Sequence, residues 1–451
     1  MAIKYVKTIQ TEVFKNSTGK TKLRLLVNGD AVDATNIKRN GRTKVKYGVV
    51  PDKEGWVKTS DLILKGLLEI YFLDVGQGDS TFIVTPNRKK ILVDGGENDL
   101  ALEFLAWKYK LDKVSTENPV IIDLLIISHV DNDHIKGLIP IITSPKIKVK
   151  RIIHGGLISF ADDVYKKQLG ETAEVGEIIY ITTSHDKIEE LEGLQLSYRF
   201  RLWRDAIKNE VDVQYQAVDS RTGKLDFDDP SIKLEILGPR VNILSDGTIA
   251  YEWFTDHGHT SNGHSVVVRL TYDKIKLMLS GDLNIDGSEN LLRDETLTKK
   301  MDSHILKAPH HGSHEFKLEW LKAVNPQISV ISSGDQKDHA HPRANFLGAT
   351  GLSSRSDHPL LFSTEIAATF VEAGQKVQKY IKLSDKRKKK LTQKDTKILK
   401  GLFLKKLNGL INVRTNGQQM FAARRYGGKD EWEIYSEIQP STRTRKCKEY
   451  E

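Results

Sequence analysis

Four side chains that suit a divalent metal ion crowd into one turn of the chain. The apolar run Leu124–Ile127 contains no polar residue, which is typical of a fully buried strand. Within a few positions of its end come His129, Asp131, Asp133 and His134. Charged groups rarely lie at the end of a core strand unless they are paired or bound to a metal. The spacing therefore predicts a metal centre at a sheet edge, and a solvated turn is the alternative.

Glycine-containing turns precede this segment. The expected strands Leu68–Leu73 and Thr81–Val84 flank the septet Asp-Val-Gly-Gln-Gly-Asp-Ser, and the expected strand Lys90–Val93 ends at Asp-Gly-Gly. Two glycines around Gln77 allow a tight turn and a close approach of backbone to a ligand or metal. We expect the site to be shaped by Asp74, Gly76, Gln77, Gly78, Asp79 and Asp94.

Further polar groups follow expected strands in the second half of the chain. Asp282 comes after the strand Lys276–Leu279, where a carboxylate suits a ligand that bridges two metal ions. The other candidates near expected strands are His154, Asn262, His264, Ser265, His310, His311, Ser313 and His341. His154 could face the site, but a structural histidine is the favoured interpretation.

Together these motifs resemble the metallo-β-lactamase-fold hydrolases, whose signature is His-x-His-x-Asp-His. The closer resemblance is to the subgroup typified by the metallohydrolase domain of the DNA-uptake protein ComEC, where aspartate replaces the second histidine, as Asp131 does here. The septet ending at Ser80 is a hallmark of that subgroup. Asp-Gly-Gly, Ser-Gly-Asp, His-His-Gly-Ser and His-Pro also match, so the resemblance covers roughly residues 68–345.

The resemblance implies an α/β (α+β) fold, a four-layered αβ/βα sandwich with two metal ions at one rim. It assigns to the first ion His129 and Asp131, with Asn262 or His264 in place of a third histidine. It assigns to the second ion Asp133, His134 and His310, with His311 as the substitute for His310 and Asp282 between the ions. Ser265 and Ser313 belong to the motifs that shape the site.

The same resemblance implies the chemistry. Asp133 would orient a metal-activated hydroxide, and His341 would protonate a leaving group or hold a phosphate oxygen. Oxygen ligands at Asp131 and Asn262 shift the expected metal from Zn²⁺ toward Mn²⁺ without deciding between them. We expect phosphodiester hydrolysis, most simply a nuclease with nucleic acid as substrate. The alternatives are a small phosphoester such as phosphocholine or a cyclic nucleotide, and a non-catalytic binding protein with a weakened metal site.

Composition limits the remaining possibilities. The 451 residues carry 69 Lys and Arg against 60 Asp and Glu, and a net charge of +9 suits an anionic partner. The single cysteine, Cys447, excludes an intramolecular disulfide and a cysteine-based zinc site. No apolar stretch is long enough to cross a bilayer, and the first residues lack a signal-peptide core. We expect a cytoplasmic protein.

The chain divides into three expected regions. Residues 1–65 form a small β module that resembles bacterial SH3-like domains around Gly55-Trp56-Val57, and it could bind a protein or cell-wall ligand. Trp56 is expected in its core, with a binding groove as the alternative. Residues 66–385 form the hydrolase domain, with an insertion at 160–230. Residues 386–451 provide a basic connection, a β-hairpin and a polar tail. Lys388, Lys389 and Lys390 are expected to be solvated, with phosphate contact as the alternative.

Overall fold

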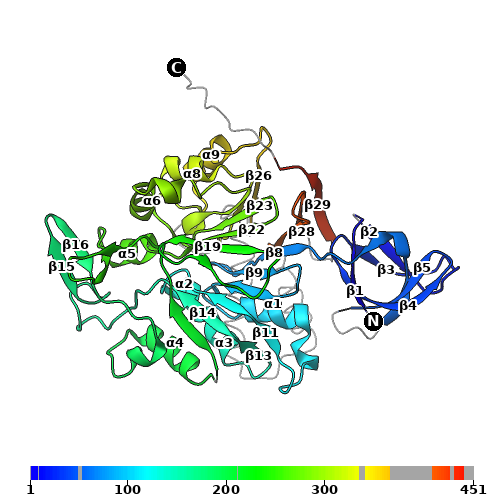
Figure 1. Cartoon of the computed structure of the whole chain (residues 1–451), viewed down its shortest axis with the longest axis horizontal. Helices are drawn as coiled ribbons and strands as arrows, with labels where there is room; N and C mark the ends of the chain where they lie inside the picture. The colour runs from blue at the N-terminus through cyan, green and yellow to red at the C-terminus, as the bar shows by residue number, and fades with distance from the viewer. Residues whose placement is uncertain are drawn as a thin grey trace, which may run out of the picture.

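Two large sheets face each other in the computed structural model, and a smaller all-β unit lies at one end (Figure 1). The structure describes residues 2–8, 10–48, 53–210, 212–334, 341–365, 409–426 and 431–440. The strands expected between residues 68 and 331 are present, and their bounds differ from the predicted ones by one or two residues. Lys388, Lys389 and Lys390, the strands expected at 369–381 and the polar tail with Cys447 lie outside the described residues.

The first sheet has nine strands, and its central strands run parallel. In spatial order they are β17 (Gln214–Ala217), β14 (Arg151–His154), β12 (Leu124–Ile126), β10 (Lys90–Val93), β9 (Thr81–Val84), β8 (Leu68–Phe72), β27 (Ile411–Thr415), β28 (Met420–Tyr426) and β29 (Glu431–Ile438). Its outer face is covered by α1 (Leu100–Tyr109), α3 (Ile139–Ile142) and α4 (Tyr198–Lys208). Phe104, Ile141 and Trp203 from these helices are buried against Phe82 and Leu125.

The second sheet has seven strands and its own helical cover. In order they are β18 (Gly223–Leu225), β19 (Lys233–Gly238), β22 (Val267–Tyr272), β23 (Ile275–Leu279), β24 (Ile305–Lys307), β25 (Ile328–Ile331) and β26 (Leu360–Ser363). The covering helices are α6 (Ile285–Leu292), α7 (Glu295–Thr298), α8 (Leu318–Val324) and α9 (Ala344–Leu352). Trp320 and Phe346 pack there against Leu306.

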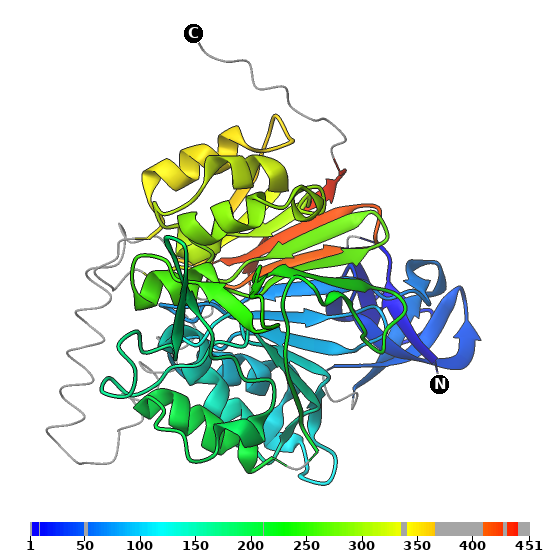
Figure 2. The same ribbon diagram turned by 60° about the vertical axis from the view of Figure 1, so that its left-hand side comes forward.

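The inner faces of the two sheets share a third apolar cluster. Ile70, Ile83 and Ile126 of the first sheet meet Val268 and Leu277 of the second. Strands buried on both faces read as continuous apolar runs, which explains why Leu124–Ile127 carries no polar residue. Figure 2 shows the resulting order of helices, sheet, sheet and helices, so the four-layered sandwich is confirmed.

The N-terminal unit is a strongly curved seven-stranded sheet. Its order is β3 (Lys22–Val27), β2 (Gln10–Phe14), β6 (Lys53–Lys58), β5 (Arg42–Tyr47), β4 (Ala31–Arg39), β1 (Ala2–Val6) and β7 (Leu62–Ile63). Val13, Val45 and Val57 form its core. Trp56 alternates with Val57 and is partly exposed on the opposite face, so the expectation of a core tryptophan was wrong. The SH3-like resemblance stays a prediction.

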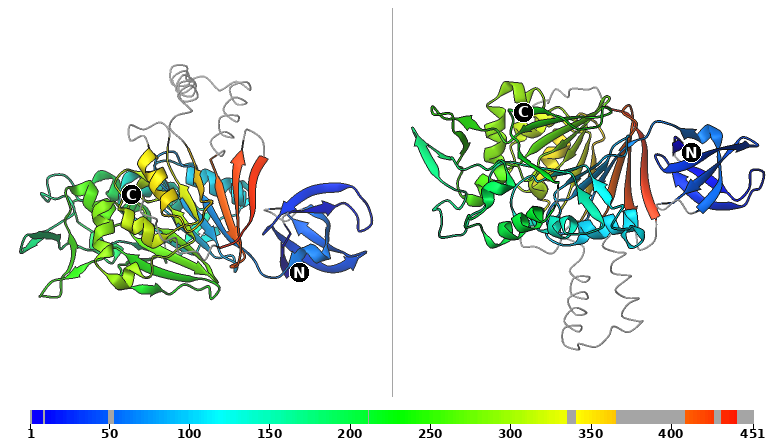
Figure 3. Two further views of the ribbon diagram at one scale, coloured as in Figure 1. Left: turned by 90° about the horizontal axis from the view of Figure 1, so that it is seen from above. Right: turned by 60° about the horizontal axis from the view of Figure 1, so that its bottom comes forward.

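Figure 3 shows this unit beside β28 and β29. Arg414 of β27 donates a hydrogen bond to the backbone oxygen of Asn28 and pairs with Asp30 at 3.3 Å, which fastens the unit to the nine-stranded sheet. The predicted hairpin around Asn416-Gly417 is present, and its first strand pairs with β8. The hairpin therefore completes the hydrolase sheet, whereas the sequence suggested a separate C-terminal region.

The 160–230 segment holds the expected mixture of helix and hairpin. The strands β15 (Thr172–Val175), β16 (Ile178–Ile181), β21 (Ile249–Glu252) and β20 (Asn242–Ile243) form a four-stranded sheet at one end of the molecule. The remaining short elements are β11 (Val120–Ile122), β13 (Ile147–Val149), α2 (Asn132–Ile135) and α5 (His257–Gly263). Among the described residues no helix combines the length and apolar character needed to traverse a bilayer.

Candidate metal centre

Side chains from both sheets converge at one rim of the sandwich. His129 follows β12, and Asp133 and His134 lie on α2, which is the next element after that strand. From the facing sheet Asp282 follows β23, and His311 follows β24. Because parallel neighbours end at the same edge, loops far apart in the sequence meet there. Three such groups are His129–His134–Asp282, Asp133–His134–His311 and Asp79–Asp282–His311, with ligand atoms within 4.8 Å of one another in each.

Asp282 is the centre of this arrangement. Its Oδ1 lies 3.4 Å from Nε2 of His134, and its Oδ2 lies 3.1 Å from Nε2 of His311. The same nitrogen of His311 lies 3.5 Å from Oδ2 of Asp133. One carboxylate thus faces ligands from two different strand ends, which is the geometry a bridging ligand needs.

Several buried atoms in this cluster have no hydrogen-bond partner among the described residues. They are Nε2 of His129, His134 and His311, and Oδ1 of Asp282. Buried polar atoms in folded proteins are nearly always hydrogen-bonded, so orphaned lone pairs that face one another need an explanation. Imidazole nitrogens and carboxylate oxygens are the donors that divalent ions take. The donor set therefore fits divalent metal ions.

A comparison with protein families agrees with this geometry. The family model of the metallo-beta-lactamase superfamily matches residues 73–334, more than half of the chain. The chain belongs to the metallo-beta-lactamase superfamily.

Two curated relatives of this metallo-beta-lactamase chain are bacterial proteins. ComE operon protein 3 of Bacillus subtilis is 23% identical over 292 residues, which cover 62% of the chain and 30% of that protein. Competence protein ComA of Neisseria gonorrhoeae is 34% identical over 82 residues, or 18% of the chain and 12% of that protein. The chain thus spans less than a third of either relative. Among solved structures, Tm1679, a metal-dependent hydrolase of the beta-lactamase superfamily, aligns at 13% identity and a TM-score of 0.34, covering 66% of this chain and 96% of that one.

Oxygen atoms behind the rings orient two histidines of the metallo-beta-lactamase centre. Oδ2 of Asp94 lies 2.9 Å from Nδ1 of His134, and its Oδ1 accepts the backbone N–H of Ser128 at 2.8 Å. Nδ1 of His311 donates to the backbone oxygen of Ser332 at 3.1 Å. An oxygen on the far nitrogen fixes the tautomer and aims Nε2 at the metal. Asp94 therefore lies as a support, whereas Asp79, 3.2 Å from the same nitrogen of His311, also belongs to a group that could hold an ion.

A buried lysine enters the same support. Lys307 is 2% exposed and its ammonium pairs with Asp79, which is 4% exposed. Burial lowers the pKa of Lys307 well below its usual range. No motif marks this residue in the sequence, although a single lysine inside the apolar run Ile305–Ala308 is an available signal.

The glycines of the septet bring its turn against α2. Gly78 has φ +105°, and a Cβ there would stand 2.0 Å from the backbone oxygen of Asp133. The next residue, Asp79, donates its backbone N–H to that oxygen at 3.3 Å. Gln77 donates from Nε2 to Oδ2 of Asp133 at 3.2 Å, so the turn positions this carboxylate. Gly76 packs against Gly334, and Asp74 lies beside Gly409, away from the cluster.

Asp133 is held ionised by its neighbours. Burial raises its pKa, but the hydrogen bond from His311 and the charges of His134 and His311 outweigh burial and hold the pKa well below its usual range. An ionised carboxylate can only accept hydrogen bonds, so Asp133 can bind a cation or orient a water molecule.

The first-ion side of the cluster is more open. Oδ1 of Asp131 accepts from Oγ of Ser261 at 2.9 Å, and its Oδ2 lies 3.7 Å from Nε2 of His129. Oδ1 of Asn262 is buried without a hydrogen-bond partner among the described residues. Oγ of Ser265 accepts the backbone N–H of Asp282 at 3.1 Å and so fixes the backbone of that residue.

His264 is not brought to this side. Its Nε2 donates to the backbone oxygen of Glu252 at 2.8 Å, its ring stacks on Phe254, and burial lowers its pKa to about 4. At His154, Nδ1 accepts from the backbone N–H of Gly156 at 3.1 Å and the ring stacks on Tyr215, while Nε2 is buried without a hydrogen-bond partner among the described residues. Nε2 of His264 is therefore not available as a ligand, whereas a metal contact of His154 stays a prediction.

His311, the substitute in the expected ligand set, reaches Asp133 and Asp282. Nδ1 of His310 is buried without a hydrogen-bond partner among the described residues and lies 3.5 Å from Glu315, so His310 as the ligand stays a prediction. Both residues have positive φ, which turns the chain sharply after β24. The N–H of Ser313 closes this turn on the backbone oxygen of His310 at 2.8 Å. The ring of His341 lies 5.8 Å from that of His310 and 6.3 Å from that of His311, so it borders the centre.

A groove of about 860 Å³ opens beside Asp131 and Asp133. Its far wall comes from the 160–230 segment and includes Asp162, Asp163 and Tyr198, of which Tyr198 is 64% exposed. Arg199 also lines it. The sequence placed an insertion here but no motif marked these residues, because a groove wall needs a position and not a fixed residue type.

Proposed function

We propose that this chain is a metal-dependent phosphodiesterase that acts on nucleic acid. The observation that carries the proposal is Asp282, a buried carboxylate whose two oxygens face His134 and His311 beside an open groove. Two divalent ions bound at such a site activate water and neutralise charge on a phosphoryl oxygen. Hydrolysis of a phosphodiester needs both effects.

The chain's own residues supply the remaining roles. Asp133 is ionised, lies at the groove and is held by Gln77, so it can accept a hydrogen bond from the attacking water and align it. His341 borders the centre and can give a proton to the leaving oxygen. The proposed ligands are His129, Asp131 and Asn262 on one side, Asp133, His134 and His311 on the other, and Asp282 between them. The oxygen donors of Asp131 and Asn262 favour Mn²⁺ over Zn²⁺ on the first side.

The substrate class is supported by the resemblance to the DNA-uptake subgroup. One relative is named a competence protein, and the septet ending at Ser80 is the subgroup's motif. A second candidate substrate is a small phosphodiester with a cationic group, and two acidic residues of the groove favour it. Asp162 and Asp163 line the wall opposite the metal ligands, where they would attract a cation and repel a second phosphate.

The test is cleavage of labelled single-stranded DNA, double-stranded DNA and RNA, with glycerophosphocholine as the small cationic competitor. Each is incubated with Mn²⁺, with Zn²⁺ and with EDTA. We expect Mn²⁺-dependent cleavage of a polynucleotide that His134→Ala and Asp282→Ala abolish. Hydrolysis of glycerophosphocholine alone would replace the nuclease with the second candidate. No hydrolysis by a protein that carries two metal equivalents would reject both.

The adjacent histidines provide a matched pair for the metal site. His311→Gln should lose one equivalent of bound metal, measured by plasma emission spectrometry, because its Nε2 faces two carboxylates. His310→Gln should keep both equivalents. The opposite result would restore His310 as the ligand.

A further inference from the structure

The positive charge of this protein is concentrated away from the metal centre. Residues 1–65 contain 14 Lys and Arg against 6 Asp and Glu, a net charge of +8. Residues 66–365, which hold the metal centre and the groove, contain 34 against 45, a net charge of −11. Residues 366–451 contain 21 Lys and Arg against 9 Asp and Glu, but most of them lie outside the described residues. An acidic hydrolase domain attracts a polyanion poorly, so the N-terminal unit is the basic region of the described chain where an anionic polymer would bind.

Strand register gathers part of that charge on one surface. Directly opposed residues of neighbouring strands share a face, and the register aligns Arg39 with Arg42 and Arg42 with Lys58. This row crosses β4, β5 and β6, and its residues are exposed or partly exposed. The next row aligns Lys44 with Trp56, and Trp56 with Phe14 of β2. We call the residues Arg39, Arg42, Lys44, Trp56 and Lys58 the basic outer face.

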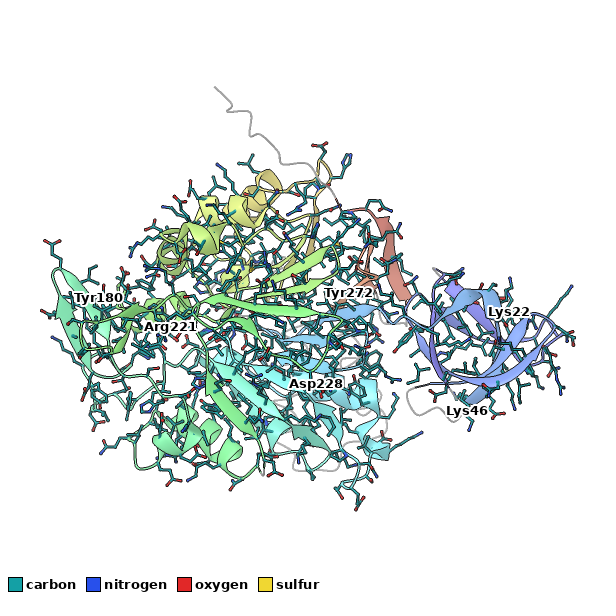
Figure 4. The ribbon with its side chains drawn as sticks, viewed as in Figure 1. Lys22, Lys46, Tyr180, Arg221, Asp228 and Tyr272 are labelled. Atoms are coloured by element: carbon teal, nitrogen blue, oxygen red, sulfur yellow. The ribbon has the colours of Figure 1, made fainter. Side chains whose placement is uncertain are left out.

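The inner face of the same strands packs in the core of the unit, so the basic outer face is not needed to form that core. Thr43, Val45 and Val57 alternate with the outer residues and are fully buried. Figure 4 labels Lys46, which continues the outward series of β5, and Lys22 on β3. Acidic residues compensate the other cations of this unit: Lys22 pairs with Glu12, Lys44 pairs with Glu54 at 2.7 Å, and Asp33 opposes Lys46.

Aromatic rings lie among these cations. Trp56 is partly exposed, and the guanidinium of Arg42 stacks 3.6 Å above the ring of its neighbour Phe14. Cations that follow a phosphate backbone, combined with an aromatic surface for bases, are the elements by which proteins bind single-stranded nucleic acid. A surface that bound anions only through charge would not need a tryptophan between Lys44 and Phe14.

We infer that the basic outer face is a binding site for single-stranded nucleic acid, in which Trp56 stacks on a base and Arg39, Lys44 and Lys58 contact phosphates. The inference goes beyond the proposed cleavage, because binding here requires no metal and is measured in EDTA. A failed cleavage assay therefore does not contradict binding at the basic outer face. A failed binding assay likewise does not contradict cleavage at the metal centre.

The experiment measures fluorescence anisotropy of a labelled single-stranded DNA oligonucleotide with the full chain in EDTA. The double variant Arg39→Glu/Lys58→Glu should bind roughly a hundredfold more weakly, about tenfold for each reversed charge. The control Lys299→Glu/Lys322→Glu changes the net charge equally, on exposed positions of the helical layer in the hydrolase domain, and should change binding less than about twofold. Equal weakening in both double variants would overturn the site.

Variants of Trp56 distinguish the contribution of base stacking to binding from the contribution of charge. Trp56→Ala should weaken binding roughly tenfold, and Trp56→Phe should restore most of the affinity, since any aromatic ring can stack on a base. Wild-type affinity of Trp56→Ala would overturn the stacking role. Competition by poly-glutamate as strong as that by DNA would identify a general polyanion surface instead, and competition by a soluble cell-wall polymer alone would reject nucleic acid as the ligand.

Discussion

The hydrolase domain and the N-terminal unit use charged residues in opposite ways. At the metal centre the charges are buried and each has a neighbour: Asp94 faces His134, and Asp79 faces both Lys307 and His311. On the basic outer face like charges stand side by side and reach solvent, as Arg39, Arg42 and Lys58 do. A buried charge destabilises the fold unless an opposite charge compensates it, whereas an exposed cation is solvated and remains able to bind an anionic partner. In these proposals hydrolysis takes place at the metal centre, and the nucleic acid is bound by the basic outer face of a different region.

The strongest test of this separation removes the carboxylate of Asp282. Asp282→Asn should lower the rate of metal-dependent hydrolysis roughly a thousandfold, because metal-ion stabilisation of the transition state is worth several kcal/mol. Binding of single-stranded DNA in EDTA should not change. Steady-state rates and anisotropy are measured on the same preparation, with Asp246→Asn on a surface turn as the control. A parallel loss of binding would mean that the two regions are not independent.

The buried lysine should matter for stability. Lys307→Met leaves Asp79 without its cation in a buried site and should lower the free energy of unfolding by about 3 kcal/mol. The double variant Asp79→Asn/Lys307→Met should recover at least half of that loss. Urea unfolding of the metal-free protein measures both. A neutral single variant would show that the pair is not required for compensation.

The salt concentration should affect DNA binding at the basic outer face more than hydrolysis at the metal centre. If three cations of the basic outer face contact phosphates, raising salt from about 50 to about 200 mM should weaken binding of single-stranded DNA roughly twentyfold. Hydrolysis of bis(p-nitrophenyl) phosphate, which is too small to reach both regions, should change less than about twofold. A flat salt dependence of DNA binding would contradict the phosphate contacts.

The smallest effect concerns a neutral histidine of the hydrolase core. Burial lowers the pKa of His154 from 6.5 to about 3. Below pH 6.5 the unfolded chain therefore binds a proton that the folded chain does not, so stability falls as the pH falls. At pH 5 the loss is about 2 kcal/mol relative to neutral pH.

His154→Asn keeps an acceptor for the N–H of Gly156 but removes the titration. The stability advantage of the wild type over this variant should shrink between pH 7.5 and pH 5, measured by urea unfolding. The exposed His358 provides the control variant His358→Asn. An advantage that stays constant with pH would show that His154 is not kept neutral by the fold.

The sequence by itself determined the sandwich and the place of its metal centre. Apolar runs such as Leu124–Ile127 encode strands covered on both faces, and the groups that follow them must meet at one edge when those strands lie in parallel. The local chemistry of Asp133, His134 and Asp282 was therefore visible in the order of residues alone.

Only the tertiary structure decided which neighbours turn inward. His310 and His311 have the same side chain at adjacent positions, and the positive φ of both residues decides that His311 faces Asp282. His264 follows the matching motif, yet its Nε2 is taken by the backbone of Glu252. Trp56 lies on the outer face because strand alternation assigns the inner position to Val57. Residue types set what a site can do, but direction depends on backbone angles and on partners distant in sequence, which no local pattern encodes.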